Sequence, residues 1–310
     1  MADLKLIVAG IGDHERALRT GEAKAQGIDL EVVDVDRPFM RMSRGLEFDV
    51  AEMSMSVYLC ARSVERPFTA IPVFPNRGGF SAGISCRVDR GINDPRDLEG
   101  KRVGLRLFTV TNQVQGRGML KSAFRVDTDA VTWVVFGESH VAEYVPPSNV
   151  EMAPAGKTLE GMLLDGEIDA ALGVAPQSNQ IRWLISPDES VEIDARRYRE
   201  TGIWEIGQTV AIKDATLQAH PWIAEALFHA FTTAKNLYLQ QLRAGKIETP
   251  EDRAWVRAIT LVGDDPLPYG VAPNRKALDA SVEMNLEQRV IPSRIDIDSL
   301  FVPSTRAFLG

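Results

Sequence analysis

Cysteine and histidine are scarce in this 310-residue sequence, and their scarcity excludes several kinds of site. The two cysteines, Cys60 and Cys86, are too few for a disulfide framework or a cysteine-rich zinc cluster. A reducing compartment tolerates both as buried apolar residues, and one disulfide between them is the alternative. The four histidines stand at none of the spacings typical of metal ligands, so no metal site is predicted, and a metal held by carboxylates alone stays open. Gly116-Arg117-Gly118 lacks the third glycine of a dinucleotide-binding motif, and no cofactor is predicted.

Long apolar runs and an excess of positive charge are also absent. No run of 18 or more apolar residues occurs, so no membrane span is predicted. The amino terminus shows no basic leader followed by an apolar stretch, which favours a cytoplasmic location; a periplasmic location is the alternative if a leader was removed. With 43 acidic and 35 basic residues, a net charge of −8 argues against nucleic acid as a partner but not against a small anionic ligand. A monomer and a homodimer both stay open.

The sequence does contain an alternation of strand-like and helical runs, and its length predicts two lobes. Strands are predicted at 4–9, 28–35, 48–54, 68–74, 101–105, 131–136, 168–174 and 209–212. Helices are predicted at 15–26, 39–46, 56–64, 109–123, 158–165, 221–242 and 274–289. Strands separated by helices indicate α/β lobes, each with a mixed sheet flanked by helices.

The order of these runs predicts that the second lobe is inserted into the first. Lobe one would comprise residues 1–86 and 211–310, and lobe two residues 87–210, with 84–87 and 208–213 as the crossing strands. Such lobes form a cleft, and ligands of α/β sheets bind beyond the carboxyl ends of the strands. Helix N-termini at these ends present N–H groups that suit a carboxylate or a phosphate.

Two stretches, Asp49–Tyr58 and Ile71–Arg77, resemble the 4,5-dihydroxyphthalate decarboxylase family. Shorter matches are Asp13-His14-x-Arg16, Gly100–Gly104, Arg117-Gly118, Leu163–Ala170, His220–Trp222 and Pro268–Gly270. The resemblance implies a type II periplasmic binding-protein fold with the ligand cleft between the lobes. It also implies cofactor-independent decarboxylation of a small hydroxylated, phthalate-like carboxylate in aromatic catabolism.

Two places depart from the family's pattern. Where the family carries imidazole groups, this chain has Gly78–Ala82 after Arg77 and Gln208 at the return crossing. Neither replacement transfers a proton near neutral pH. The departures favour the alternative function, a solute-binding protein of an ABC transporter that captures a small anionic ligand by lobe closure.

Glu52, His14 and His140 are the candidate catalytic residues for proton transfer. Glu52 stands among small and apolar residues, where desolvation raises the pKa of a carboxyl group; capping of the following helix is the alternative. His14 follows the first predicted strand, and a solvated loop histidine is the alternative there. His140 stands beside Glu138 and Ser139, although neighbours in sequence do not define a catalytic triad.

Three arginines, Arg16, Arg77 and Arg117, are candidate cations for ligand carboxylates. A guanidinium at a strand end can grip a carboxylate bidentately, and a structural ion pair is the alternative for Arg77 and Arg117. The glycines beside Arg117 also predict a close helix approach. The other predicted substrate-binding residues stand at strand ends and helix starts or are aromatic: Asp13, Ser54, Ser56, Phe108, Thr109, Asn112, Ser139, Trp204, Gln208 and Tyr269.

Overall fold

The computed structural model describes residues 4–9, 16–33 and 35–310, and the chain forms two compact units. Unit 1 comprises the chain up to Arg77, Trp204–Val282 and Ser293–Gly310; unit 2 comprises Gly78–Ile203 and Glu283–Pro292. The chain therefore leaves unit 1 after Arg77 and returns at Trp204, earlier than the predicted boundaries after residues 86 and 210. The return of Glu283–Pro292 to unit 2 is not predicted from the sequence.

Unit 1 is built on a five-stranded mixed sheet in the order β2-β1-β3-β11-β4. Its strands are β1 (Leu4–Ala9), β2 (Ile28–Val33), β3 (Val50–Ser54), β4 (Phe68–Ile71) and β11 (Gln208–Lys213). β1 is parallel to β2 and β3, whereas β11 is antiparallel to β3 and β4. All five residues of β3 are buried, as expected of a central strand covered on both faces. The predicted strands of this sheet are confirmed, with ends that differ by a few residues.

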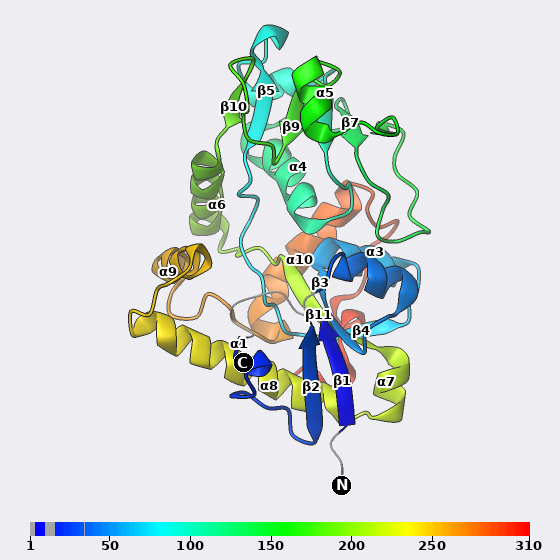
Figure 1. Ribbon diagram of the computed structural model, residues 1–310, viewed down its shortest axis with the longest axis vertical. Helices are drawn as coiled ribbons and strands as arrows, with labels where there is room; N and C mark the ends of the chain where they lie inside the picture. Colours follow the sequence, from blue (N-terminus) through cyan, green and yellow to red (C-terminus); the bar gives the residue numbers. More distant parts are fainter. Residues whose placement is uncertain (1–3, 10–15, 34) are drawn as a thin grey trace. The chain divides into compact units, whose positions relative to one another are not determined.

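The helices of unit 1 are α1 (Arg16–Arg19), α2 (Pro38–Met40), α3 (Met55–Ser63), α7 (Asp214–Ala219), α8 (Ile223–Arg243), α9 (Pro250–Val262) and most of α10 (Val271–Glu287). The predicted helix over 15–26 is wrong in extent, because α1 ends at Arg19 and Gly21 turns the chain at φ 74°. The predicted helix over 39–46 forms as α2 followed by a π-helical turn, Arg41–Gly45. Figure 1 shows the long α8 beside α1, with which it is in contact.

Unit 2 contains a six-stranded sheet in the order β10-β5-β9-β6-β7-β8. Its strands are β5 (Ile84–Arg87), β6 (Arg102–Leu105), β7 (Thr132–Val135), β8 (Val150–Met152), β9 (Ala170–Leu172) and β10 (Ile181–Ile185). β5 is antiparallel to β9 and β10, and the other neighbours are parallel. Neither predicted crossing strand links the two sheets, because β5 pairs within unit 2 and β11 within unit 1.

The helices of unit 2 are α4 (Thr111–Phe124), α5 (Leu159–Asp165) and α6 (Pro187–Thr201). α5 begins after Thr158, whose hydroxyl accepts from the Gly161 N–H, and ends at Gly166 with φ 74°. Its apolar side packs with β7 and β9 in a buried core that includes Leu163 and Val134. No helix in the described part of either unit is long and apolar enough to span a bilayer.

Candidate functional site

A buried carboxyl group lies in the middle of β3, two residues before the carboxyl end of the strand. Glu52 is 1% exposed and stands opposite Val210 of β11, and Ser54 stands opposite Gln208. Residues opposite one another in a ladder share a face of the sheet, as do residues two apart on one strand. The structure therefore brings three predicted site residues, Glu52, Ser54 and Gln208, to one face of the unit 1 sheet.

Helix α3 starts directly after these residues. Ser54, rather than Glu52, occupies its N-cap position, and the Ser54 side chain makes no capping hydrogen bond. The Met55 N–H donates to the Gly207 carbonyl at 2.9 Å, and Ser56 in the first turn is 1% exposed. The positive end of the α3 dipole thus lies beside the end of the strand that carries Glu52.

Asp13 and His14 follow β1 in the sequence, and both lie outside the described residues. β1 is parallel to β3, with Ala9 opposite Ala51, so the carboxyl end of β1 lies in register next to Glu52. The predicted roles of Asp13 and His14 stay predictions.

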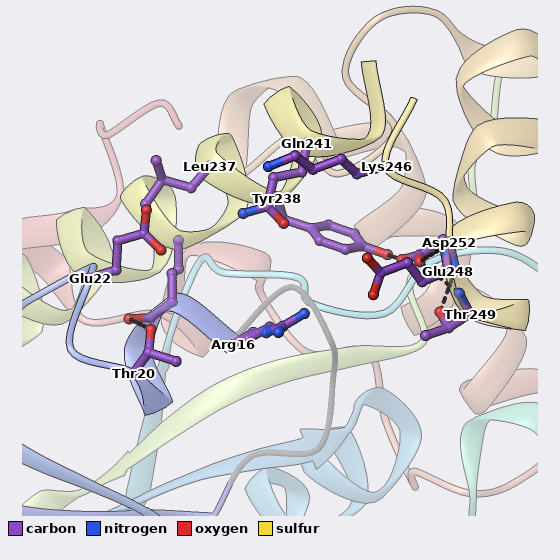
Figure 2. Close-up of a pocket in the computed structure, with 12 residues that line it drawn as sticks. Arg16, Thr20, Glu22, Leu237, Tyr238, Gln241, Lys246, Glu248, Thr249 and Asp252 are labelled. Carbon is purple, nitrogen blue, oxygen red and sulfur yellow. Dashed lines mark hydrogen bonds between the residues drawn. The ribbon is translucent and has the colours of Figure 1, made fainter. Parts of the chain in front are cut away.

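Arg16 lines a pocket of about 370 Å³ in unit 1, shown in Figure 2. The pocket is lined by residues of α1 and α8, of the segments that follow these two helices, and of the start of α9: Arg16, Ala17, Thr20, Glu22, Ala234, Leu237, Tyr238, Gln241, Lys246, Glu248, Thr249 and Asp252. Charges of both signs meet here, with Arg16 and Lys246 against three carboxyl groups. Arg16 stays a predicted carboxylate contact, in surroundings that already supply anionic side chains.

Asp252 forms one wall of this pocket and holds the start of α9. Its carboxylate accepts the Tyr238 hydroxyl at 2.7 Å and the N–H groups of Glu248 and Thr249, both at 2.8 Å (Figure 2). Thr249 in turn caps the Asp252 N–H, which completes a capping box. Burial acts to raise the pKa of Asp252, but the hydrogen bonds from Thr249, Tyr238 and Glu248 outweigh it and lower the pKa.

We expect Asp252→Asn to lower the free energy of unfolding by about 1–3 kcal/mol at pH 7, because an amide places donors against N–H groups. The lowered pKa of Asp252 means that its contribution is complete above about pH 4 and is lost as the pH falls through the folded-state pKa. Urea unfolding at pH 7 and near pH 3 measures both effects. A stability difference that does not shrink at the lower pH would contradict this account.

Arg77 acts as a clamp inside unit 1. Its guanidinium donates to the carbonyl groups of Trp204 and Glu205 and to Asn274 Oδ1, and Arg77 forms a β-bridge with Ile206. Burial lowers the pKa of Arg77 to about 9, which leaves it cationic at neutral pH. Each of the three nitrogens thus has a protein acceptor, and neutral groups take the place of the predicted ligand carboxylate. The predicted ligand contact of Arg77 stays a prediction.

Replacing Arg77 by lysine should cost about 2 kcal/mol of stability in the absence of any ligand, since one ammonium cannot reach three separated acceptors. Chemical unfolding measures the loss. Arg16→Lys, at an exposed position, is the matched control and should change stability little. Equal stability of the wild type and Arg77→Lys would show that the clamp contributes nothing.

Arg117 is a buried cation in unit 2. The side chain is 1% exposed, and its guanidinium carbon lies 3.7 Å from the centre of the Phe108 ring. Its Nη2 donates to the Phe108 carbonyl at 2.8 Å and its Nε to Gln288 Oε1 at 2.8 Å. Among the described residues no carboxylate lies within 4 Å of Arg117, so the alternative of a structural ion pair is not formed there.

The glycines beside Arg117 let other segments of unit 2 approach α4 closely, as predicted. A Cβ at Gly118 would lie 2.8 Å from Met284 Sδ, and a Cβ at Gly116 would lie 2.9 Å from Leu172 Cδ2. Both distances are shorter than ordinary carbon contacts, so a side chain at either position would require the Met284 or Leu172 side chain to move.

The loops around the start of α4 hold further predicted residues. Thr109 is fully buried, with its hydroxyl 3.4 Å from that of Ser139, which accepts the Val141 N–H. Val110 occupies the N-cap position of α4 and makes no side-chain capping hydrogen bond, and Asn112 is exposed in the first turn. His140 is half-buried in the loop after β7. The structure thus brings Phe108, Thr109, Ser139 and Arg117 together.

The two predicted aromatic contacts lie in unit 1. Trp204 is half-buried, and its ring N–H donates to the Pro266 carbonyl at 3.0 Å. Tyr269 is fully buried, with Lys235 Nζ 4.8 Å from its ring centre and Phe228 against its edge. Protein atoms therefore cover the ring that was predicted to stack on a substrate. Sequence reasoning missed Glu205, a carboxyl residue 1% exposed between Trp204 and Ile206, although its place before β11 was a usable signal.

Cys60 and Cys86 are both buried and form no disulfide, so the disulfide alternative is wrong and the apolar role is confirmed. Burial raises the pKa of the Cys86 thiol, which keeps it protonated. Across residues 4–9, 16–33 and 35–310, no three His, Cys, Asp or Glu side chains are grouped as metal ligands would be.

The fold places the chain in a known structural class. It is similar over 98% of its length to the periplasmic aliphatic sulphonate binding protein SsuA from Escherichia coli, with 99% of that chain covered, a TM-score of 0.54 and 12% identity. The fold is therefore that of the type II periplasmic binding proteins, as the sequence resemblance implies.

Sequence comparison narrows the class to a family. The family model described as NMT1/THI5 like matches residues 24–241. A 4,5-dihydroxyphthalate decarboxylase of Comamonas testosteroni is 29% identical, over 98% of both chains. Another, from Pseudomonas putida, is 35% identical over 56% of this chain and 71% of that protein. The chain belongs to the NMT1/THI5-like family, and within it to the 4,5-dihydroxyphthalate decarboxylase family.

Proposed function

We propose that this protein is a cofactor-independent decarboxylase of a small hydroxylated aromatic carboxylate of the phthalate type. The observation that carries the proposal is the likeness, over 98% of both chains, to a protein named 4,5-dihydroxyphthalate decarboxylase. The buried carboxyl group of Glu52, on one face with Ser54 and Gln208, supports it because such a group is suited to proton transfer.

Decarboxylation of such a substrate requires only a few groups from the protein. A ring hydroxyl ortho or para to the leaving carboxylate supplies electrons as the ring carbon takes up a proton. The bond to the carboxylate then breaks, CO₂ leaves, and its electron pair restores the aromatic ring. The protein must supply a proton donor, a cation for the retained carboxylate and surroundings that exclude water.

Residues of this chain can take each role. We assign the proton to Glu52, with His14 and His140 as the other candidates. Arg16, Arg77 and Arg117 are the candidate cations. Arg117 is favoured among them, because acceptors surround Arg77 and carboxyl groups stand near Arg16.

The direct test is to incubate the purified protein with 4,5-dihydroxyphthalate and follow CO₂ release and the loss of ultraviolet absorbance. Hydroxylated benzoates and phthalate itself serve as comparison substrates. Turnover that requires the ring hydroxyl supports the proposal. Absence of turnover with every hydroxylated substrate would reject it.

The second candidate function is capture of a small anionic ligand without chemistry, which the fold and the residues at Gly78–Ala82 and Gln208 favour. Ligands that raise the melting temperature without being consumed would favour this function. Cell fractionation adds a discriminator, since we expect the decarboxylase in the cytoplasm and a transport component in the periplasm. Size-exclusion chromatography with light scattering tests the homodimer alternative.

A further inference from the structure

The environment of Arg117 is unusual for a buried cation. Taking a charge out of water costs several kcal/mol unless an opposite charge is near. Arg117 is 1% exposed, and the described residues place no carboxylate within 4 Å of it. Burial lowers the pKa of Arg117 to about 9, partly offset by Tyr144, so the side chain still carries its charge at neutral pH. The positive charge is therefore uncompensated.

Neutral groups fix the guanidinium from several sides. Phe108 supplies its carbonyl to Nη2 and its ring face to the guanidinium plane. Gln288 accepts from Nε at 2.8 Å, and its own amide donates to the Val114 carbonyl at 2.9 Å. This second bond fixes which end of the Gln288 amide faces Arg117. Nη1 is buried and has no acceptor among the described residues, which leaves an N–H edge suited to an oxygen anion.

Gln288 is held firmly where it stands. It belongs to the segment 283–292, which returns to unit 2 from α10. On one side of it Glu287 pairs with Lys121 at 2.9 Å, and on the other Arg289 pairs with both carboxylate oxygens of Asp129 at 3.0 Å. The two ion pairs flank Gln288 and limit its freedom to turn away from α4.

We propose that Arg117 anchors one carboxylate or sulfonate group of the ligand and that Gln288 is its positioning residue. The neutral amide orients the guanidinium without cancelling its charge, so the ligand anion supplies the missing counter-charge. A glutamate at position 288 would orient the guanidinium equally well but would neutralise it. This inference rests on the anionic ligand of the proposed function and adds a residue that the family resemblance does not identify.

The test compares two substitutions at one position. Gln288→Glu keeps an acceptor for Nε and adds a charge, whereas Gln288→Met keeps the site neutral and removes the acceptor. We expect calorimetry with phthalate to show binding about tenfold or more weaker for Gln288→Glu, with a smaller loss for Gln288→Met. The ligand-free melting temperature of Gln288→Glu should equal or exceed that of the wild type, because its buried cation gains a partner.

Which of the two variants loses more phthalate binding distinguishes a positioning role of Gln288 from a packing role. If Gln288 only supported the fold, Gln288→Met would be the more damaging change and Gln288→Glu the milder. Glu151→Gln, which removes an exposed carboxylate on β8 of the same unit, is the matched control and should leave phthalate binding unchanged. Equal binding by the wild type and Gln288→Glu would overturn the inference, as would a wild type that does not bind phthalate at all. Phthalate binding without CO₂ release from 4,5-dihydroxyphthalate would remove the decarboxylase proposal and leave this inference standing.

Discussion

Replacing Glu52 by glutamine should reduce CO₂ release from 4,5-dihydroxyphthalate by roughly 100-fold or more, the range in which a positioned acid or base contributes. Glutamine has nearly the shape of glutamate but no proton to give. Because Glu52 is 1% exposed in the middle of a central strand, bulk water cannot readily take over its role. Steady-state kinetics should show the loss in kcat, with a much smaller change in KM.

A control separates this chemical effect from a loss of structure. Glu47→Gln removes an exposed carboxylate that pairs with Arg41, five residues before Glu52, and should leave turnover unchanged. The melting temperature of Glu52→Gln should be close to that of the wild type. Turnover within a few-fold of the wild type would assign the proton to another group, with His14 and His140 as the next variants to measure.

The second large effect is expected for Gly270→Ala, which should lower the free energy of unfolding by about 3 kcal/mol or more. Gly270 has φ 109°, a conformation that residues with a side chain adopt at a cost of about 1–2 kcal/mol or more. A Cβ there would also collide with the Phe308 carbonyl oxygen, part of the backbone. The Gly270 N–H donates to the Pro72 carbonyl at 2.8 Å, so the strain would pass to the segment after β4.

Gly245→Ala isolates the collision from the backbone conformation. Gly245 has φ 78°, and no atom lies within 4 Å of the position that a Cβ would take, so its replacement should cost only about 1 kcal/mol. Urea unfolding of both variants gives the two free energies. Similar losses for both would mean that the chain end moves aside at no cost and that the close contact at Phe308 is unimportant.

Most strands could be predicted because each is a short apolar run bounded by polar or turn residues, as β1 and β6 show. The helices α6 and α9 were missed although each begins with a clear signal. Ser186-Pro187 followed by Glu189 and Thr249-Pro250 followed by Asp252 are both capping boxes in the structure. Charged residues dominate α6 and the first turn of α9, so a search led by hydrophobic runs passes over the starts of these helices.

In the candidate site, residues that are close in sequence could be predicted, whereas contacts between distant segments could not. Glu52 and Ser54 could be predicted because the strand end and the helix start are contiguous in sequence. The contact between Gln288 and Arg117 joins residues 171 apart, and no local pattern marks either as the partner of the other. The three acceptors of Arg77 come from two segments that are distant in sequence, so no local pattern predicts them.

The composition of unit 2 has a consequence for how the protein is made. A ribosome releases the chain from its amino terminus, so Gly78–Ile203 emerges well before Glu283–Pro292. Until synthesis is nearly finished, Met284 cannot pack against α4 at Gly118, and Arg117 lacks the Gln288 amide as its acceptor. Unit 2 therefore completes its folding only after residues 283–292 have been synthesised.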